Sequence, residues 1–245
     1  MTNTTKINLA TLAATAASAA LVLGDVFALG HTADMKDYPA FSPAYIEQLG
    51  GMVPAPLLAA TMEQLMISSM AISFSIPFLV AAMWLVGQTL RNRDQWYSTA
   101  LFWGLMTSAA LFPLVHARFF FVAGLLKTIV NTDPSAHPIL LQAAQDFMRL
   151  YYIGWGIAML VITISWITYM VFVFLGKPYL PRKAGFVTPF FLLILLNLLL
   201  NLPPANPITT TFGGSTLSLA YLLFFIFFGL WYRKPLLMEL KIKNT

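Results

Sequence analysis

The feature that most constrains this fold is a series of apolar stretches too long for a soluble domain. Six stand out, at about residues 8–30, 57–89, 97–130, 143–175, 185–203 and 215–232. A helix needs about 20 apolar residues to cross a hydrocarbon core of about 30 Å. Only 9% of the 245 residues are charged, whereas soluble domains carry about 25%. The sequence therefore predicts an all-α fold, a polytopic bundle of six transmembrane helices, with residues 1–245 forming a single integral membrane domain.

The loops between these stretches alternate in charge. Loops of one kind hold most of the basic residues, namely Lys6, Arg91, Arg93, Lys177, Arg182, Lys183, Arg233, Lys234, Lys241 and Lys243. Loops of the other kind hold two lysines against four acidic residues, namely Lys36, Lys127, Asp34, Asp37, Glu47 and Asp133. Because basic loops stay in the cytoplasm, we expect both termini there. This bias also accounts for the net charge of +5 without a nucleic-acid partner.

The second, third and fourth stretches are long for simple crossings, at roughly 33 residues or about 50 Å each, with a rise of 1.5 Å per residue. Tilt accounts for part of this length. Counted from their basic ends, the excess lies on the outer side, so we expect helical extensions there. Pro77 is expected to kink the second stretch.

The first stretch, "NLATLAATAASAALVLG", resembles a signal peptide in its small residues. It is preceded by a single lysine, which is weak for a signal. Small residues also let a helix approach its neighbours closely in lipid. We therefore expect a retained helix at the centre of the bundle. The chain has no cysteine, so it offers no thiolate metal site and no cysteine nucleophile.

Polar residues within or beside the apolar stretches lie mostly on the predicted outer side. They are Asp25, His31, Glu63, His116, Arg118, Asp146, Arg149, Asn197 and Asn201. Ionisable residues inside a membrane face the bundle interior or a cavity and pair with one another. We therefore predict an outward-facing polar pocket, in which His116 meets Asp25, Glu63 or Asp146.

Asp25, Glu63 and His116 are the catalytic candidates, since a buried carboxylate beside an imidazole can act as a general acid–base pair. Together with His31 they also form a weak alternative, a divalent metal site, because carboxylate and imidazole bind zinc. No HxxxH or HExxH spacing supports a metal, and no GxSxG elbow supplies a nucleophile. The sequence points to no particular cofactor, and it leaves open whether the protein is an enzyme.

The ligand-binding candidates are Arg118, Asp146, Arg149, Asn197 and Asn201. Arginines fit the recognition of a phosphate or carboxylate headgroup. Each of these residues also has a structural interpretation. The arginines can reach the outer interface, Asp146 and Arg149 can form a salt bridge one turn apart, and the asparagines can join neighbouring helices.

Three functions fit these features. The leading hypothesis is a membrane protein whose outward-facing pocket binds, and in one version processes, an amphipathic or lipid-like small molecule. The second is a proton- or ion-coupled small-molecule transporter, against which the dry cytoplasmic half counts. The third is a non-catalytic accessory or assembly subunit, whose polar residues only hold helices together. Membrane lipids are expected partners in all three, and the oligomeric state stays open.

Four short motifs carry a resemblance that covers most of the chain. They are Gly24-Asp25, Lys36-Asp37-Tyr38-Pro39, His116-Ala117-x-Phe119-Phe120 and Gly176-Lys177-x-x-x-Pro181-Arg182. With them the chain resembles a bacterial family of small polytopic membrane proteins of unknown function. The resemblance implies a location in the bacterial inner (plasma) membrane and supplies no reaction.

Overall fold

The computed structural model describes residues 2–50, 54–91, 94–116 and 118–242. Its helices are α1 (Asn3–Leu29), α2 (Pro43–Gln48), α3 (Ala55–Ala59), α4 (Met62–Phe74), α5 (Ile76–Gln88), α6 (Trp96–His116), α7 (Arg118–Asn131), α8 (His137–Phe174), α9 (Pro189–Asn201), α10 (Pro207–Gly213), α11 (Thr216–Phe227) and α12 (Arg233–Ile242). Short 3-10 turns lie at Met35–Asp37, Pro134–Ala136 and Arg182–Val187, and a π-helical turn, Phe228–Tyr232, joins α11 to α12. The described residues contain no strand beyond one isolated antiparallel bridge, Leu90 to Pro178. The predicted all-α class is confirmed.

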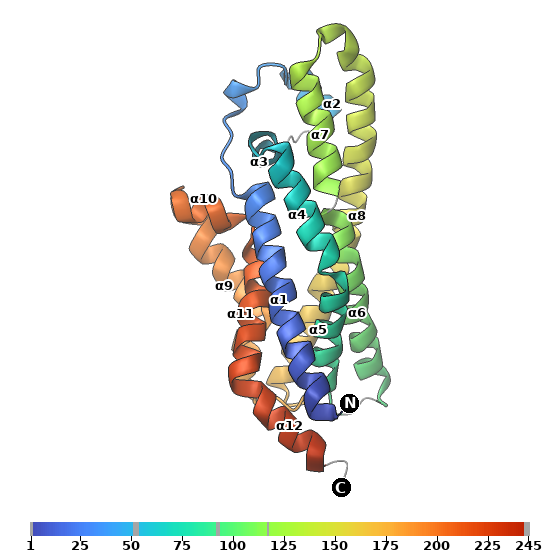
Figure 1. The fold of residues 1–245 in the computed structure, drawn as a ribbon, viewed down its shortest axis with the longest axis vertical. Helices are drawn as coiled ribbons and strands as arrows, with labels where there is room; N and C mark the ends of the chain where they lie inside the picture. Colours follow the sequence, from blue (N-terminus) through green and yellow to red (C-terminus); the bar gives the residue numbers. More distant parts are fainter. Residues whose placement is uncertain (1, 51–53, 92–93, 117, 243–245) are drawn as a thin grey trace.

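α1 packs against α4, α5 and α11 on one face (Figure 1) and exposes Leu9, Leu12 and Leu23 on the other. Its buried positions include Ala10, Ala14, Ala17 and Ser18. The Ser18 hydroxyl donates to the Ala14 carbonyl at 2.8 Å, so this polar group is satisfied within the helix. Small side chains let these three helices come close to the alanine-rich face of α1. The expectation of a helix at the centre of the bundle is therefore met only on that face, because the opposite face is exposed.

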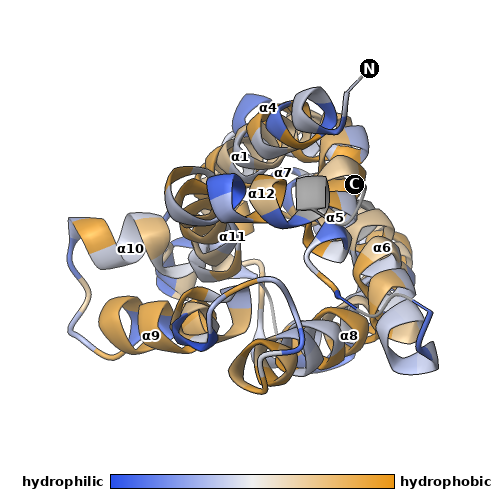
Figure 2. Cartoon of the chain, turned by 90° about the horizontal axis from the view of Figure 1, so that it is seen from below, coloured by the Kyte–Doolittle hydropathy of each residue, from blue (hydrophilic) through white to orange (hydrophobic). Residues whose placement is uncertain are grey.

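Three helical stretches of the described chain are long and apolar enough to cross a membrane: Asn3–Leu29, Pro134–Phe174 and Thr216–Glu239. The pair α4 and α5 would add a fourth if it forms one bent span. Apolar residues predominate on the helices when the bundle is seen from the end where α1 starts (Figure 2). Many large apolar side chains are also exposed, among them Trp103, Leu160 and Ile164. The chain thus has the helices of a membrane protein, while six crossings stay a prediction.

The bend between α4 and α5 measures 43° and lies at Ser75. Pro77 stands in the first turn of α5 and has no N–H to bond to the preceding turn. The Ser75 hydroxyl donates to the Ile72 carbonyl at 2.6 Å, which gives an acceptor at the end of α4 a partner. The kink expected at Pro77 is confirmed.

The fifth apolar stretch, expected over 185–203, forms the shorter helix α9 of 13 residues. Pro189 is in its first turn, and Thr188 before it is extended, with φ −68° and ψ 152°. A residue before proline is kept out of helical conformation, so α9 cannot begin earlier. The helix ends at Asn201, close to two successive prolines, 203 and 204. Its length is about 20 Å at 1.5 Å per residue, short of a core of about 30 Å.

α7 and the first half of α8 extend past α1 at the end of the bundle opposite to the start of α1 and the end of α12 (Figure 1). We call the end with the α7–α8 extension the distal end, and the end with the start of α1 and the end of α12 the terminal end. A separate apolar cluster of α7 and α8, which includes Val122, Leu126 and Leu141, holds this extension together with residues of the 41–58 segment. Of the three stretches expected to extend beyond the bundle, the third and the fourth do so at this end, through α7 and α8. Two predicted basic-loop residues, Arg93 and Lys243, lie outside the described residues.

Candidate functional site

Asp25 lies in the last turns of α1 and is buried, with 2% of its surface exposed. At the preceding residue, Gly24, α4 comes so close that a Cβ atom would lie 2.6 Å from Ile72 Cδ1. The Asp25 carboxylate contacts α11, where the Ser218 hydroxyl donates to Oδ2 at 2.5 Å. Glycine at position 24 therefore lets α4 pack closely on one side of α1, while Asp25 contacts α11 on the other side.

His116 is the last residue of α6 and is also buried, with 7% of its surface exposed. Its Nδ1 atom lies 3.3 Å from Asp25 Oδ1. The imidazole centroid lies 4.5 Å from the ring centroid of Phe112 and 4.9 Å from that of Phe119. Phe112 and His116 are four residues apart and share one face of α6. Aromatic side chains from α6 and α7 therefore enclose the imidazole beside the carboxylate.

Asp25, His116 and Ser218 form what we call the polar joint, which links α1, α6 and α11. Asp25 Oδ1 and His116 Nδ1 face each other without an aligned hydrogen bond, and neither has another hydrogen-bond partner among the described residues. A carboxylate with an imidazolium, or a carboxylic acid with a neutral imidazole, has zero net charge. Both states hold the same single titratable proton, on the imidazole in the first state and on the carboxylate in the second. The joint can therefore keep a single proton between two ionisable groups without burying net charge.

Two buried serine hydroxyls beside the last turns of α1 also have no hydrogen-bond partner in the described chain, those of Ser68 and Ser215. The Ser68 carbonyl would lie 3.2 Å from a Cβ atom at Gly24. Ser215 occupies the N-cap position of α11 without a capping hydrogen bond from its side chain, one turn before the Ser218 of the polar joint. Unused hydrogen-bonding capacity thus lies on both α4 and α11, next to the end of α1 that carries the carboxylate.

Arg118 contacts the backbone of α8 and not the polar joint. Its Nη1 donates to the Leu150 carbonyl at 2.8 Å. The guanidinium lies across Gly154, where a Cβ atom would collide with Nη1. Arginines within apolar helices commonly bind backbone carbonyls. The sequence left open whether Arg118 faces the site or turns away from it, and the structure places it on α8.

Four other predicted site residues lie apart from the polar joint. Glu63 is exposed in the first turn of α4, where a carboxylate is favourable to the helix dipole. Asp146 and Arg149 are exposed on α8, and the described structure contains no ion pair between them. His31 follows α1, and its Nε2 lies 3.1 Å from the Phe27 carbonyl. No hydrogen bond or ion pair in the described chain connects any of the four to the joint.

Asn197 and Asn201 connect α9 to the next two helices. The Asn197 amide donates to the Leu193 carbonyl at 2.9 Å and to Thr216 Oγ1 at 3.2 Å. The Asn201 amide donates to Asn197 Oδ1 at 2.9 Å and to the Gly213 carbonyl at 3.3 Å. The two asparagines therefore have the contacts that their structural interpretation requires, since they bond to neighbouring helices.

The polar joint does not have the arrangement of a catalytic triad. In a triad the imidazole lies between hydroxyl and carboxylate and takes the proton of the hydroxyl. Here the carboxylate lies in the middle, so the Ser218 hydroxyl is not activated by His116. The described residues also contain no group of three His, Asp or Glu side chains that could hold a metal ion. The structure therefore does not gather the metal candidates Asp25, His31, Glu63 and His116 into one site.

Ser218 is the member of the joint that sequence reasoning missed. A serine in an apolar helix commonly donates to a carbonyl one turn earlier, as Ser18 does in α1. Nothing in "STLSLAY" distinguishes Ser218 from such a serine. Its role follows only from the packing of α11 against α1.

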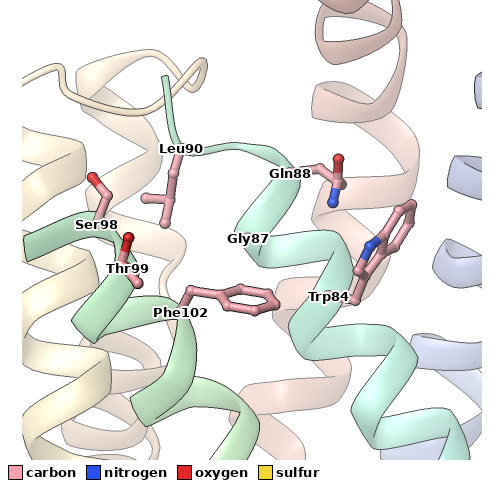
Figure 3. Close-up of a pocket in the computed structure, with 7 residues that line it drawn as sticks. All are labelled: Trp84, Gly87, Gln88, Leu90, Ser98, Thr99 and Phe102. Carbon is pink, nitrogen blue, oxygen red and sulfur yellow. The ribbon is translucent and has the colours of Figure 1, made fainter. Parts of the chain in front are cut away.

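Among the hollows that the described residues line, three open on the surface of the helices, and none of these three is lined by the polar joint. A small one of about 140 Å³ lies between α5 and α6, where Phe102 points toward α5 (Figure 3); its lining is Trp84, Gly87, Gln88, Leu90, Ser98, Thr99 and Phe102. A second, of about 250 Å³, is lined by Met66, Ser69, Met70, Ser73, Phe74, Phe120 and Phe121 of α4 and α7. The third, which we call the α6–α8 groove, has a volume of about 480 Å³ and is lined by Trp96, Tyr97, Ala100, Leu101, Gly104, Val161, Ile164, Ser165, Thr168 and Phe172.

Comparison with known proteins places the chain in a family without assigning it an activity. The model of a family of unknown function (DUF6796) matches residues 1–234. The chain therefore belongs to this family, in agreement with the resemblance drawn from its motifs. No curated protein and no solved structure matches the chain.

Proposed function

We propose that this member of a family of unknown function is a non-catalytic, multi-pass membrane protein that binds a lipid-like molecule in the α6–α8 groove. The observation that carries the proposal is the groove itself, about 480 Å³ in volume and walled almost entirely by apolar and aromatic side chains. Sites for small molecules have volumes of about 300–1,000 Å³ and are mostly apolar. The ligand would then lie toward the terminal end and not in the outer polar pocket that the sequence suggested.

The chemistry of the groove favours a ligand that enters from the bilayer. Ile164 is 56% exposed in the wall of the groove, and Trp96 is 79% exposed at the end that begins α6. In water such a surface would be unfavourable, whereas in a membrane it faces acyl chains. Tryptophan is enriched at the level of lipid headgroups. These features support an amphipathic ligand that keeps its polar end at the interface.

For the membrane arrangement we propose six crossings in a bacterial inner membrane, with both termini in the cytoplasm. The start of α1 and the end of α12 lie at the same end of the bundle, as an even number of crossings requires (Figure 1). Basic residues follow α5, α8 and α11 at this end, namely Arg91, Lys177, Arg182, Lys183, Arg233 and Lys234. An excess of lysine and arginine favours the cytoplasmic side. α9 is the shortest of the proposed crossings and would require a locally thinned bilayer.

Native mass spectrometry of gently extracted protein tests the binding proposal. The wild type is expected to retain a lipid-sized adduct. Ile164→Trp, which fills the groove, is expected to lose it. Leu160→Trp is the matched control, because Leu160 is 60% exposed one turn away on the same helix and does not line the groove. Equal retention by both variants, or no adduct on the wild type, would contradict the proposal.

The polar joint supports a second candidate, proton-coupled transport. Chains of Asp, Glu and His within membranes mark proton pathways, and Asp25 with His116 is a buried pair of this kind. The joint would need a second arrangement in which water reaches it. Proteoliposomes that contain a pH-sensitive dye would then acidify faster with the wild type than with Asp25→Asn. Identical proton leak in wild-type, Asp25→Asn and protein-free vesicles would leave the joint with the structural role of the third hypothesis.

A further inference from the structure

The end of the α6–α8 groove near Trp96 carries a positive charge. Lys177 follows α8 and is exposed. Its Nζ atom lies 4.3 Å from the ring centroid of Tyr97 and 4.5 Å from that of Phe172. Both rings line the groove. The ammonium group therefore lies at the rim of an apolar site, held by two aromatic faces.

The backbone fixes this position of Lys177. α8 ends in a Schellman motif, in which the Lys177 N–H donates to the Phe172 carbonyl and the Gly176 N–H donates to the Val173 carbonyl, both at 3.0 Å. Gly176 has φ +72°, a conformation that favours glycine. The motif turns the chain back over the last turn of α8, which brings Lys177 to the ring of Phe172. Its placement thus follows from the helix end and not from an acidic partner.

No acidic side chain in the described structure forms an ion pair with Lys177. Asp94 lies close in sequence to the groove residue Trp96, and it is exposed and forms no such pair either. A cation held against aromatic rings keeps its charge available to an anionic group of a ligand. The rim of the groove is therefore complementary to negative charge.

The length of the groove fits one leaflet. Its wall on α8 runs from Val161 to Phe172, which corresponds to about 16 Å at a rise of 1.5 Å per residue. Half of a hydrocarbon core of about 30 Å is about 15 Å. The apolar wall ends where Lys177 and the exposed Trp96 begin, the order in which a phospholipid presents its acyl chain and its headgroup.

We propose that the α6–α8 groove is a site for an anionic phospholipid of the leaflet at the terminal end, with an acyl chain along α6 and α8 and the headgroup phosphate on Lys177. This inference rests on the proposed lipid-binding function and adds the class of headgroup. A net-negative headgroup gains the attraction of Lys177 without the opposing ammonium group that a zwitterionic choline lipid carries.

Titration of delipidated protein in a nonionic detergent, followed by native mass spectrometry, tests this assignment. The probes are phosphatidylglycerol and phosphatidylcholine with identical acyl chains. The wild type is expected to bind the glycerol lipid about fivefold more tightly, which is the conversion of about 1 kcal/mol for one lysine near an anionic surface. Lys177→Gln should remove the preference, and Lys177→Arg should keep it. Lys183→Gln, a change in the same loop at an exposed lysine that does not line the groove, is the control.

The outcomes separate the headgroup assignment from the proposed function. Equal binding of both lipids by the wild type, or an unchanged preference in Lys177→Gln, overturns the assignment to an anionic lipid. If Ile164→Trp then still abolishes binding of both lipids, the lipid-binding groove stands without it. If Ile164→Trp binds both as well as the wild type, the groove itself is overturned. Because the Schellman motif uses the backbone N–H of Lys177, the Gln variant is expected to keep the wild-type melting temperature.

Discussion

At the scale of single residues, the polar joint explains why ionisable side chains occur in apolar helices of this chain. Asp25 and His116 meet at 3.3 Å, and Ser218 supplies a hydrogen bond to the free side of the carboxylate. Each group would be costly to bury alone, at about 2.5–3.5 kcal/mol on insertion scales for an aspartate at the centre of a span. Together they hold one proton and no net charge. The low cost of burying these two groups therefore depends on both side chains being present.

His116→Ala is predicted to lower the stability of the folded protein by about 1–3 kcal/mol, because Asp25 Oδ1 has no polar neighbour other than His116 Nδ1 among the described residues. Thermal unfolding in detergent measures the effect. The control is His31→Ala, since the His31 ring lies 3.1 Å from the Phe27 carbonyl in the last turn of α1, is partly exposed and is not part of the joint. Equal shifts of melting temperature in the two variants would argue against the joint as a stabilising contact.

The same joint makes the two single changes interdependent. Removing Asp25 in a protein that already lacks His116 should cost less than removing it from the wild type, with a coupling energy of about 0.5–3 kcal/mol. A double-mutant cycle of Asp25→Ala and His116→Ala gives this number directly. Additive effects on the free energy of unfolding would mean that the two side chains are neighbours with no interaction free energy between them.

At the scale of helices, the glycines of α8 set where Arg118 can lie. Gly154 leaves room for the guanidinium, which donates to the Leu150 carbonyl at 2.8 Å. Gly156, two residues later on the same helix, has no neighbouring atom within 4 Å of a Cβ position. The two glycines therefore look alike in the sequence and differ completely in packing.

Gly154→Ala is predicted to destabilise the protein by about 1–3 kcal/mol, because the added methyl group displaces Arg118 from α8. Gly156→Ala is predicted to stabilise it by about 0.5–1 kcal/mol through the higher helix propensity of alanine. Melting temperatures of both variants test the pair. Arg118→Ala should remove most of the penalty of Gly154→Ala, and persistence of the full penalty without Arg118 would show that another contact causes it.

Helix boundaries show what the sequence could and could not predict. Apolar length located the helices, and Pro77 located the bend between α4 and α5. Thr188 and Pro189 also carried the signal for the late start of α9, although apolar length alone suggested an earlier one. No such signal marks the end of α6 at His116. In the site, a charged pair in an apolar setting was predictable because burial requires a partner, whereas Ser218 depended on helix packing.

At the scale of the whole molecule, polarity divides the bundle along its axis. The terminal end carries basic residues in its loops, and the distal end carries the α7–α8 extension with its own apolar cluster. The polar joint lies between them, on the distal side of α1. The proposed orientation in the membrane rests on this division, because an excess of lysine and arginine favours the cytoplasmic side.

Labelling of introduced cysteines is predicted to place the two ends on opposite sides of the membrane. The chain has no cysteine of its own, so each introduced thiol is unique. Lys183→Cys at the terminal end should react with an impermeant maleimide only after the cells are opened. Ser135→Cys, in the exposed turn between α7 and α8, should react in intact cells. The reverse pattern would invert the topology, and reaction of both in intact cells would exclude it.

The glycine that ends α8 has a genetic consequence. Because Gly176 with φ +72° sets where the next residue lies, an alanine allele at 176 would alter no charge, yet it would move the ammonium group of its neighbour. Its phenotype would copy that of an allele lacking the lysine. A screen that scores variants by the chemistry of the replaced side chain would class the alanine at 176 as conservative and the loss of the lysine as a severe change. In this protein both changes are expected to weaken the same lipid contact, because the turn at Gly176 sets the position of Lys177.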